Sequence, residues 1–491
     1  MTGRLTGGTS LPGLAALLLI TGAGEDPGRR AGGVVGVEDA RPPAQLVVTG
    51  ANVLDVRTGK VRRGRTIVVD AGRISAVLAP DAPSPDARRT VEARGRLVVP
   101  GLVDAHSHLA MILGDSVSSG GGLITSLSAD PDSITAYRSR YAGAYIPYGV
   151  TTVRDVGSSE ADLRLLVDWM NAPAADIPDV YPTGGALVSH EEDRTPFPGH
   201  RVVTDPDDAR ETVRRYHDLG LRHVKLYWRL REPEFRAALS EAEQLGMIPT
   251  GHIDFHVLDI DRALDLGLRS FEHAYTLGVS ALGREEYLEA WREHLPRWIG
   301  DRRRGRFYLG VVEYFNVLGP DDPRMERLIG RLAGSRSVVV PTSHLFAQRF
   351  GLAPFDSPRL GAFDDVSDLT AQQLAHARDG YRILADYIRR MHTAGITLAT
   401  GSDWVEPGKA ILSEIWLLAE AGIPMADSLR IATLGGARAL GLEDDIGAVE
   451  PGMKAHLVIF HQDPFTDPAA IFGARTVIKD GRVVGACVPA I

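Results

Sequence analysis

Short apolar runs alternate with amphipathic segments from about Pro100 to Leu440. The runs have the length of strands and lack polar alternation, which is typical of buried parallel strands. They are Gly149–Val153, His223–Leu226, Met247–Pro249, Ser270–Phe271, Val338–Pro341 and Thr397–Ala399. Helical periodicity marks the segments between them, for example Pro206–Leu219, Pro233–Leu245, Leu258–Leu266 and Ala371–Ala394. Repeated strand–helix units predict the α/β class and a (β/α)₈ TIM barrel over residues 100–440.

The two ends of the ordered chain resemble each other and differ from the middle. Both consist of short β runs separated by glycine turns, without helical periodicity. The runs are Gln45–Val53, Arg65–Asp70, Arg73–Leu78 and Leu97–Val99 at one end, and Ala455–Phe460, Thr476–Lys479 and Arg482–Val484 at the other. Asp480–Gly481 is a hairpin turn signal. We therefore expect a small β-sandwich formed by residues 44–99 and 441–486.

Composition narrows the possible partners and ligands. The net charge of −9 and the lack of a long Lys/Arg run argue against a nucleic-acid partner. The single cysteine, Cys487, excludes an intrachain disulfide and a cysteine metal cage. Any metal must therefore bind His, Asp, Glu or a modified Lys. No apolar run reaches the roughly 18–20 residues of a membrane span.

Residues 1–43 are interpreted as a leader and linker. Leu11–Ile20 is an apolar stretch that follows Arg4 and precedes small residues, as in a secretory signal peptide. Pro12 and the single positive charge fit that pattern poorly. Cytoplasmic localisation and export through a weak signal-like segment both stay open.

The first chemical signal is the segment Leu102–His108, in which an apolar strand ends in His106-Ser107-His108. Side chains two residues apart on a strand point the same way, so both imidazoles converge on one point. Imidazole is a good ligand for zinc and its neighbours. Because barrel enzymes carry their chemistry at strand ends, we expect His106 and His108 to bind a metal.

A lysine in the apolar strand His223–Leu226 is the second signal. Lys225 is costly to bury unless it is paired or neutral, and burial lowers the pKa of a lysine. A neutral amine can react with CO₂ to form a carbamate, an anion able to bridge two metals. A buried pair with a carboxylate is the alternative interpretation.

Three more strand ends offer metal-ligand side chains. His252 follows Met247–Pro249, His273 follows Ser270–Phe271, and Asp403 follows Thr397–Ala399. One such residue would mean little, but several strand ends that all supply ligand types are a strong joint signal.

Together these segments resemble the amidohydrolase superfamily, closest to the imidazolonepropionase-like branch with its metal-dependent dipeptidases. The matching stretches are "PGLVDAHSHL", "GVTTVRDVG", "VKLYW", "TGHI", "SFEHAYTLG", "LATGSDW", "GRLVVPG" and "GAVEPGMKAHLVIF…VIKDGRVV". They span roughly residues 45–486.

The resemblance implies an amidohydrolase with two divalent metal ions, zinc by default. His106, His108 and Asp403 would bind the buried ion, and His252 and His273 the outer one. Lys225, carboxylated by CO₂, would bridge them. A metal-bridged hydroxide would cleave a C–N bond, amide or peptide-like, of a small-molecule substrate, with Asp403 moving protons. The resemblance is compatible with a homo-oligomer.

Deaminases of the same superfamily have one metal, and this chain departs from their pattern. They carry a Glu three residues after the strand-five histidine, where this chain has Phe255, with Asp254 beside it. They also lack the strand-four lysine. Both features favour two metals and amide hydrolysis.

Several polar residues are weaker candidates. Tyr227 shares its strand face with Lys225, so it is a candidate donor to the tetrahedral oxyanion or else a packed aromatic. His190, His200, His344, Trp404 and Glu406 either line the pocket or have only structural roles. Arg154 and Asp155 are expected to form an ion pair below the metals.

Two other functions stay open at this stage. A cyclic amide, lactone or ester hydrolase would use the same binuclear centre. A non-catalytic amidohydrolase-like barrel is the second alternative, but such proteins usually lose metal ligands. Specificity resides in the loops, so the substrate does not follow from the sequence.

Overall fold

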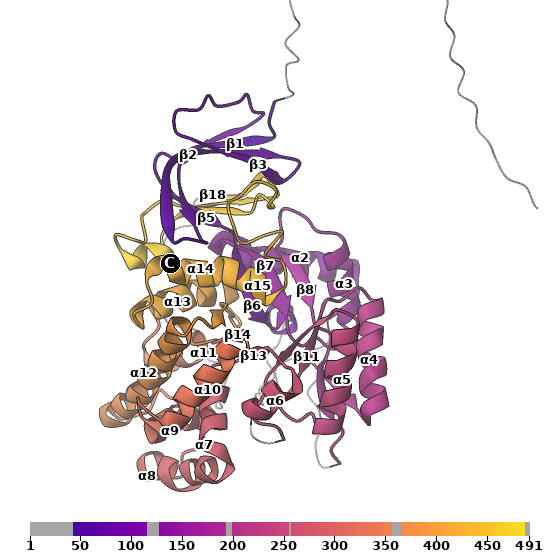
Figure 1. Ribbon diagram of the computed structural model, residues 1–491, viewed down its shortest axis with the longest axis vertical. Coiled ribbons are helices and arrows are strands. Elements are labelled where there is room, and N and C mark those ends of the chain that lie inside the picture. The colour runs from indigo at the N-terminus through magenta and orange to yellow at the C-terminus, as the bar shows by residue number, and fades with distance from the viewer. Residues whose placement is uncertain (1–42, 115–126, 193–198, 255–256, 356–364, 487–491) are drawn as a thin grey trace, which may run out of the picture. The chain divides into compact units, whose positions relative to one another are not determined.

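The computed structural model describes residues 43–114, 127–192, 199–254, 257–355 and 365–486 (Figure 1). These residues belong to one compact unit that begins at Pro43. The leader and signal-like segment predicted for residues 1–43 lie outside the described residues, apart from Pro43. Within the described part, no helix is both long and apolar enough to cross a membrane.

Nine short parallel strands form the wall of the predicted barrel. They are β6 (Leu102–Ser107), β7 (Val150–Asp155), β8 (Asp179–Pro182), β9 (Ala186–Ser189), β11 (His223–Leu226), β12 (Ile248–Gly251), β13 (Ser270–Glu272), β14 (Val338–Val340) and β15 (Thr397–Leu398). Pairing runs in two sheets, β6-β7-β8 and β9-β11-β12-β13-β14-β15, and β10 (His200–Val203) is added beside β9.

The two sheets together make eight positions around one ring. β8 pairs with β7 and β9 with β11, so β8 and β9 are two halves of one strand position. Gly184 separates them with a φ of +74°, and a Cβ there would lie 2.5 Å from the ring of Tyr216. The ring closes where the amide of Ala105 donates to the carbonyl of Thr400 at 2.8 Å. The predicted TIM barrel is confirmed.

Helices connect the strands and begin with the capping residues that the sequence supplies. Asp205 accepts hydrogen bonds from two first-turn amides of the helix Pro206–Asp218, and Thr370 forms a capping box with Gln373 at the start of the helix Ala371–Thr393. The α-helices are α1 (Leu109–Leu113), α2 (Pro131–Tyr145), α3 (Leu163–Asn171), α4 (Pro206–Asp218), α5 (Glu232–Gln244), α6 (Ile260–Leu266), α7 (Tyr275–Glu289), α8 (Leu295–Ile299), α9 (Arg306–Leu318), α10 (Pro323–Gly334), α11 (His344–Ala347), α12 (Ala371–Thr393), α13 (Pro407–Glu420), α14 (Met425–Arg430) and α15 (Gly436–Ala439). Short 3₁₀ or π segments are η1 (Ile146–Tyr148), η2 (Ala290–His294), η3 (Gln348–Phe350), η4 (Ile431–Gly435) and η5 (Pro468–Phe472).

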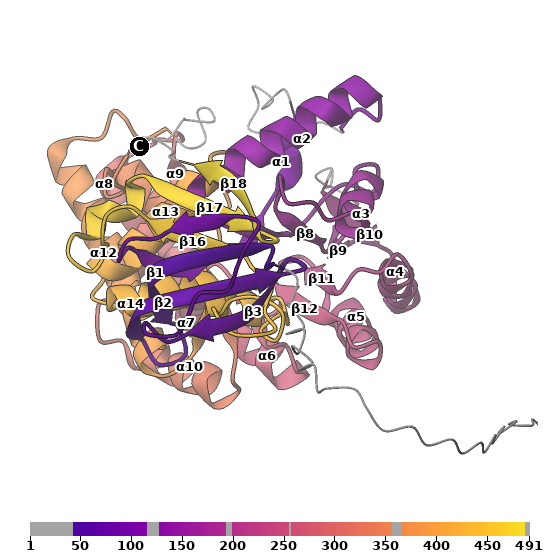
Figure 2. The same ribbon diagram turned by 90° about the horizontal axis from the view of Figure 1, so that it is seen from above.

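Strands from both ends of the chain share one mixed sheet in the order β18-β17-β16-β5-β1-β2-β3, with β4 beside β1. Figure 2 shows β16–β18 from the end of the chain beside β1–β3 from its start. These are β1 (Leu46–Asp55), β2 (Lys60–Asp70), β3 (Arg73–Leu78), β4 (Thr90–Glu92), β5 (Leu97–Pro100), β16 (Leu457–Phe460), β17 (Arg475–Lys479) and β18 (Arg482–Ala486). The Asp480–Gly481 turn has positive φ at both residues, as the hairpin signal predicts. Lys479 contacts Asp179 at the amino end of β8 at 2.6 Å, so this sheet lies at the barrel end opposite the strands' carboxyl ends.

Candidate metal centre and its pocket

One cavity of about 450 Å³ lies where the barrel strands end. All six residues that the sequence singles out as metal ligands line it, together with Tyr227. The six are His106 and His108 on and after β6, Lys225 on β11, His252 after β12, His273 after β13 and Asp403 after β15. Residues up to 297 positions apart in sequence thus share one site.

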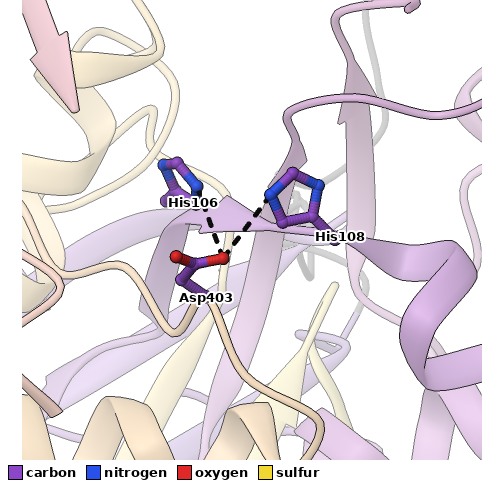
Figure 3. A group of neighbouring side chains, drawn as sticks. All are labelled: His106, His108 and Asp403. Carbon is purple, nitrogen blue, oxygen red and sulfur yellow. Dashed lines mark ion pairs between the residues drawn. The ribbon is translucent and has the colours of Figure 1, made fainter. Parts of the chain in front are cut away.

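His106, His108 and Asp403 offer three ligand atoms within 4.8 Å of one another. Oδ1 of Asp403 lies 3.7 Å from Nε2 of His106 and 3.5 Å from Nε2 of His108, and both rings turn towards the carboxylate (Figure 3). A tetrahedral zinc ion about 2.0–2.1 Å from each ligand separates neighbouring ligand atoms by roughly 3.3–3.5 Å. The buried Nε2 of His106 has no hydrogen-bond partner among the described residues. This trio therefore fits a divalent ion.

His252 and His273 lie close to the first trio, and Nδ1 of His273 is 3.7 Å from Oδ2 of Asp403. The ring centroids of His252 and His273 are 4.6 Å apart, and those of His106 and His273 are 4.5 Å apart. Nδ1 of His273 shares a hydrogen bond of 2.9 Å with the hydroxyl of Thr342, and Nε2 of His252 one of 3.2 Å with the hydroxyl of Tyr275. These contacts orient the two rings beside the first trio.

Lys225 is 1% exposed, and no described residue accepts a hydrogen bond from its Nζ. Burial lowers the pKa of Lys225 to about 8. The lowered pKa favours the neutral amine, which is the form that carbamate formation requires. The alternative of a tight buried Lys–carboxylate pair would place a carboxylate against Nζ, and the described residues supply none at hydrogen-bond distance.

Burial also keeps the histidines neutral. It lowers the pKa of His108 to about 4, with the charge of Lys225 acting in the same direction, and lowers the pKa of His106 well below its usual value. Neutral imidazole is the form that binds metals. Burial raises the pKa of Asp403 to about 7, while the charge of Lys225 opposes that rise.

Glu272 is a functional residue that sequence reasoning did not single out. Its fully buried carboxylate accepts from Nδ1 of His106 at 2.6 Å and from Arg154 at 2.7 Å, and it also accepts from the hydroxyl of Thr250. A carboxylate on one ring nitrogen fixes the tautomer and aims the other nitrogen at the metal site. The available signal was an acidic residue inside a buried strand, directly before His273.

The predicted ion pair between Arg154 and Asp155 is wrong. Neighbouring residues on a strand point to opposite faces, so the two side chains separate. Arg154 pairs with Glu272, whereas Asp155 accepts from the amide of Leu109 at 2.8 Å and the hydroxyl of Ser158 at 2.6 Å.

Asp104 connects β6 to the segment that carries Asp403. Its Oδ1 accepts from the amides of His106 and Ser402, and its Oδ2 accepts from the hydroxyl of Ser402. The amide of Asp403 donates to the carbonyl of His106 at 2.9 Å. Asp403 (φ +43°) and His273 (φ +63°) have left-handed backbones, which cost energy for these residues and concentrate at functional sites.

The weaker candidates separate into two groups. The ring of Tyr227 lies 4.9 Å from the rings of both His200 and His252, so it belongs to the site. His344 is buried against the hydroxyl of Ser413, and neither it nor Trp404 nor Glu406 lines the cavity. His190 is exposed. Phe255 lies outside the described residues, and so do residues 193–198, which lie between His190 and His200 in the sequence.

Comparisons with known proteins agree with this architecture. A sequence model of the Amidohydrolase family matches residues 357–485. Imidazolonepropionase of Kosmotoga olearia is 21% identical over 483 residues, which cover 91% of this chain and 96% of the relative. Adenine deaminase of Paracoccus denitrificans is 34% identical over 122 residues, 24% of this chain and 17% of that enzyme. A solved prolidase complexed with N-methylphosphonate-L-proline has a TM-score of 0.63 at 20% identity and covers 90% of this chain and 99% of its own, which shows a shared fold.

Proposed function

We propose that the chain cleaves an amide or peptide-like bond of a small molecule at a two-metal centre. The premise is that the chain belongs to the amidohydrolase superfamily and is a metal-dependent hydrolase of carbon–nitrogen bonds. Water adds to the carbonyl carbon and the C–N bond breaks. The products are a carboxylic acid and an amine.

The proposed ligands are the six residues that line the cavity. His106, His108 and Asp403 would hold one ion and His252 and His273 the other, and Lys225, as a carbamate, would supply a further ligand group. The observation that carries the proposal is the buried Nζ of Lys225, which has no hydrogen-bond partner among the described residues and opens on the same cavity as four histidines. Such a nitrogen is costly unless something else satisfies it. A histidine-rich donor set favours zinc.

When bound, divalent ions supply Lewis acidity and a water of lowered pKa. The carboxylate of Asp403 accepts the proton of the attacking water and returns it to the leaving nitrogen. The Tyr227 hydroxyl donates to the carbonyl oxygen as negative charge develops there. Glu272 keeps Nε2 of His106 unprotonated by holding the proton of that ring on Nδ1.

Metal analysis and a substrate panel test this proposal together. The purified full chain should contain close to two equivalents of divalent metal and hydrolyse simple amides faster than matched esters or lactones. One tightly bound equivalent with full activity would contradict the two-metal centre. Two equivalents with activity on esters alone would contradict the amide assignment.

The domain arrangement is a proposal as well. We assign catalysis to residues 100–440 and a supporting role to residues 44–99 and 441–486, since the cavity is lined from the barrel alone.

A further inference from the structure

The connection between β13 and β14 is long and holds several helices. β13 ends at Glu272 and β14 begins at Val338, and α7, η2, α8, α9 and α10 lie between them. By contrast, one helix, α6, connects β12 to β13. Figure 1 shows α7–α10 grouped at the end of the molecule away from β1–β3. Because long connections on the carboxyl side of a barrel build its pocket, this insertion is the place to look for specificity.

The insertion lines the cavity with aromatic rings. We define the aromatic wall as Tyr275, Tyr287, Trp291, Phe307 and Tyr314, all of which line the cavity. On α9 the lining residues are Phe307, Val311 and Tyr314, spaced as i, i+4 and i+7, so they share one helix face.

Contacts within the wall hold its rings in place. The rings of Tyr275 and Phe307 meet edge to face at 5.7 Å, and those of Tyr287 and Tyr314 lie 4.8 Å apart. Trp291 packs over Gly310 of α9, where an added Cβ would lie 2.3 Å from the indole. A side chain at position 310 would therefore displace Trp291 from the wall.

The wall faces the candidate metal ligands across one continuous space. Tyr275 joins the two halves, because its hydroxyl contacts His252 while its ring contacts Phe307. Two carboxylates, Asp254 and Asp403, open on the cavity, and among the described residues that line it Lys225 is the only Lys or Arg. An anionic group on the substrate, away from the metal ligands, would thus meet aromatic rings and carboxylates.

We propose that the aromatic wall is the specificity subsite of this hydrolase, and that it takes an uncharged aromatic group attached to the acyl side of the scissile bond. The inference builds on the proposed hydrolytic function and adds the substrate class. Stacked and edge-to-face contacts with a flat ring match the wall's geometry. A cavity of about 450 Å³ accommodates a small molecule with one or two rings.

Three amides that differ only at the group facing the wall test this subsite. They are propionamide, 3-phenylpropionamide and 3-(4-carboxyphenyl)propionamide, titrated by calorimetry into the metal-loaded full chain and assayed separately for release of ammonia. The phenyl compound should bind at least tenfold more tightly than propionamide, the scale expected for burying one ring. The carboxyphenyl compound should lose most of that advantage.

Phe307→Ala and Phe465→Ala are a matched pair of variants. Both phenylalanines are about equally exposed, 41% and 38%, but only Phe307 lines the cavity. Because both side chains are partly exposed, neither substitution opens a cavity in the buried core. Phe307→Ala should reduce the phenyl advantage about threefold or more, while Phe465→Ala should preserve it.

The outcomes separate the subsite from the chemistry. Equal binding of the phenyl compound and propionamide, or an equal effect of the two variants, overturns the subsite even if both amides are hydrolysed. Selective phenyl binding that depends on Phe307, without hydrolysis of any amide, upholds the subsite and refutes the proposed hydrolysis.

Discussion

Asp403 combines a metal-ligand position, a buried carboxylate and a left-handed backbone in one residue. Its φ of +43° and the hydrogen bond from its amide to His106 hold the backbone independently of the side-chain charge. Asparagine tolerates this backbone region well. The site therefore permits a substitution that removes proton transfer and little else.

We expect Asp403→Asn to lower kcat by on the order of a hundredfold or more, the usual scale for losing a general acid–base, with little change in KM. The amide still offers an oxygen to a metal but cannot accept the proton. Steady-state kinetics with metal analysis measures this, and the exposed Asp444→Asn is the control. If the variant binds two metals and has a near wild-type rate, Asp403 acts only as a metal ligand and not in proton transfer.

Lys225→Ala should abolish activity and lower the metal content, because it removes the group proposed to join the two ions. Short-chain carboxylic acids such as acetate or propionate should restore part of the activity by replacing the carbamate. The exposed Lys60→Ala should retain both properties. A metal-loaded, active crystal structure with an unmodified ammonium at Lys225 would refute this role.

At the scale of elements, a buried polar network ties four barrel strands together. Glu272 on β13 contacts His106 on β6, Arg154 on β7 and Thr250 on β12. Arg154 also donates to the carbonyl of Ala105 at 2.8 Å. The network sets the distance between strands at the level of the ligands, so it couples stability to ligand geometry.

Glu272→Gln should destabilise the fold by about 3–5 kcal/mol, the usual cost of leaving one partner of a buried ion pair uncompensated. The guanidinium of Arg154 would stay buried without a full counter-charge. Denaturant unfolding measures the loss, and weaker metal binding should accompany it. Glu232→Gln, which changes partly exposed pairs with Arg236 and Arg262, should have a much smaller effect. Equal stability of both variants would show that the network is unimportant.

At the scale of the whole molecule, the terminal sheet and the barrel share a common apolar core. Leu46 and Leu457 of the sheet belong to the same buried cluster as Leu102 and Val150 of the barrel. Cooperative unfolding of both parts is the expected consequence. Ionisable groups buried inside this unit therefore influence its overall stability.

Glu414 on α13 gives stability a defined pH dependence. Burial raises the pKa of Glu414 to about 8 from its usual value of 4.5. Below about pH 4.5 the group is protonated in both states. Between pH 4.5 and pH 8 only the unfolded chain releases the proton, so the free energy of unfolding falls progressively as the pH rises. Above about pH 8 both states are ionised, and the free energy of unfolding no longer changes through this group.

The variant Glu414→Gln should flatten this decline, which amounts to a few kcal/mol in order of magnitude. Denaturation at pH 5.5, 7.0 and 8.5 compares it with the wild type. The difference between the two proteins should change from pH 5.5 to pH 7.0 and level off above about pH 8. A constant difference would mean that Glu414 is ionised in the folded chain.

Single segments show how far sequence reasoning reached. His223–Leu226 and Arg73–Leu78 have the predicted bounds, because runs of apolar or alternating residues between turn signals define a strand locally. The division of strand three at Gly184, the helices of the β13–β14 insertion and the partner of Arg154 were not predicted. Each depends on a contact far away in sequence: Tyr216 with Gly184, Trp291 with Gly310, and Glu272 with Arg154.

The sequence alone determined the fold class and the identity of the six candidate ligands, because strand periodicity and strand-end position are local properties. Whether those side chains meet, which carboxylate holds His106, and what faces them across the cavity were decided only by tertiary structure. The ring of parallel strands brings Asp403 beside His106 across almost 300 residues, and burial there shifts the pKa values of Lys225 and His108. Proximity and desolvation are properties of the folded chain, and no local pattern encodes either.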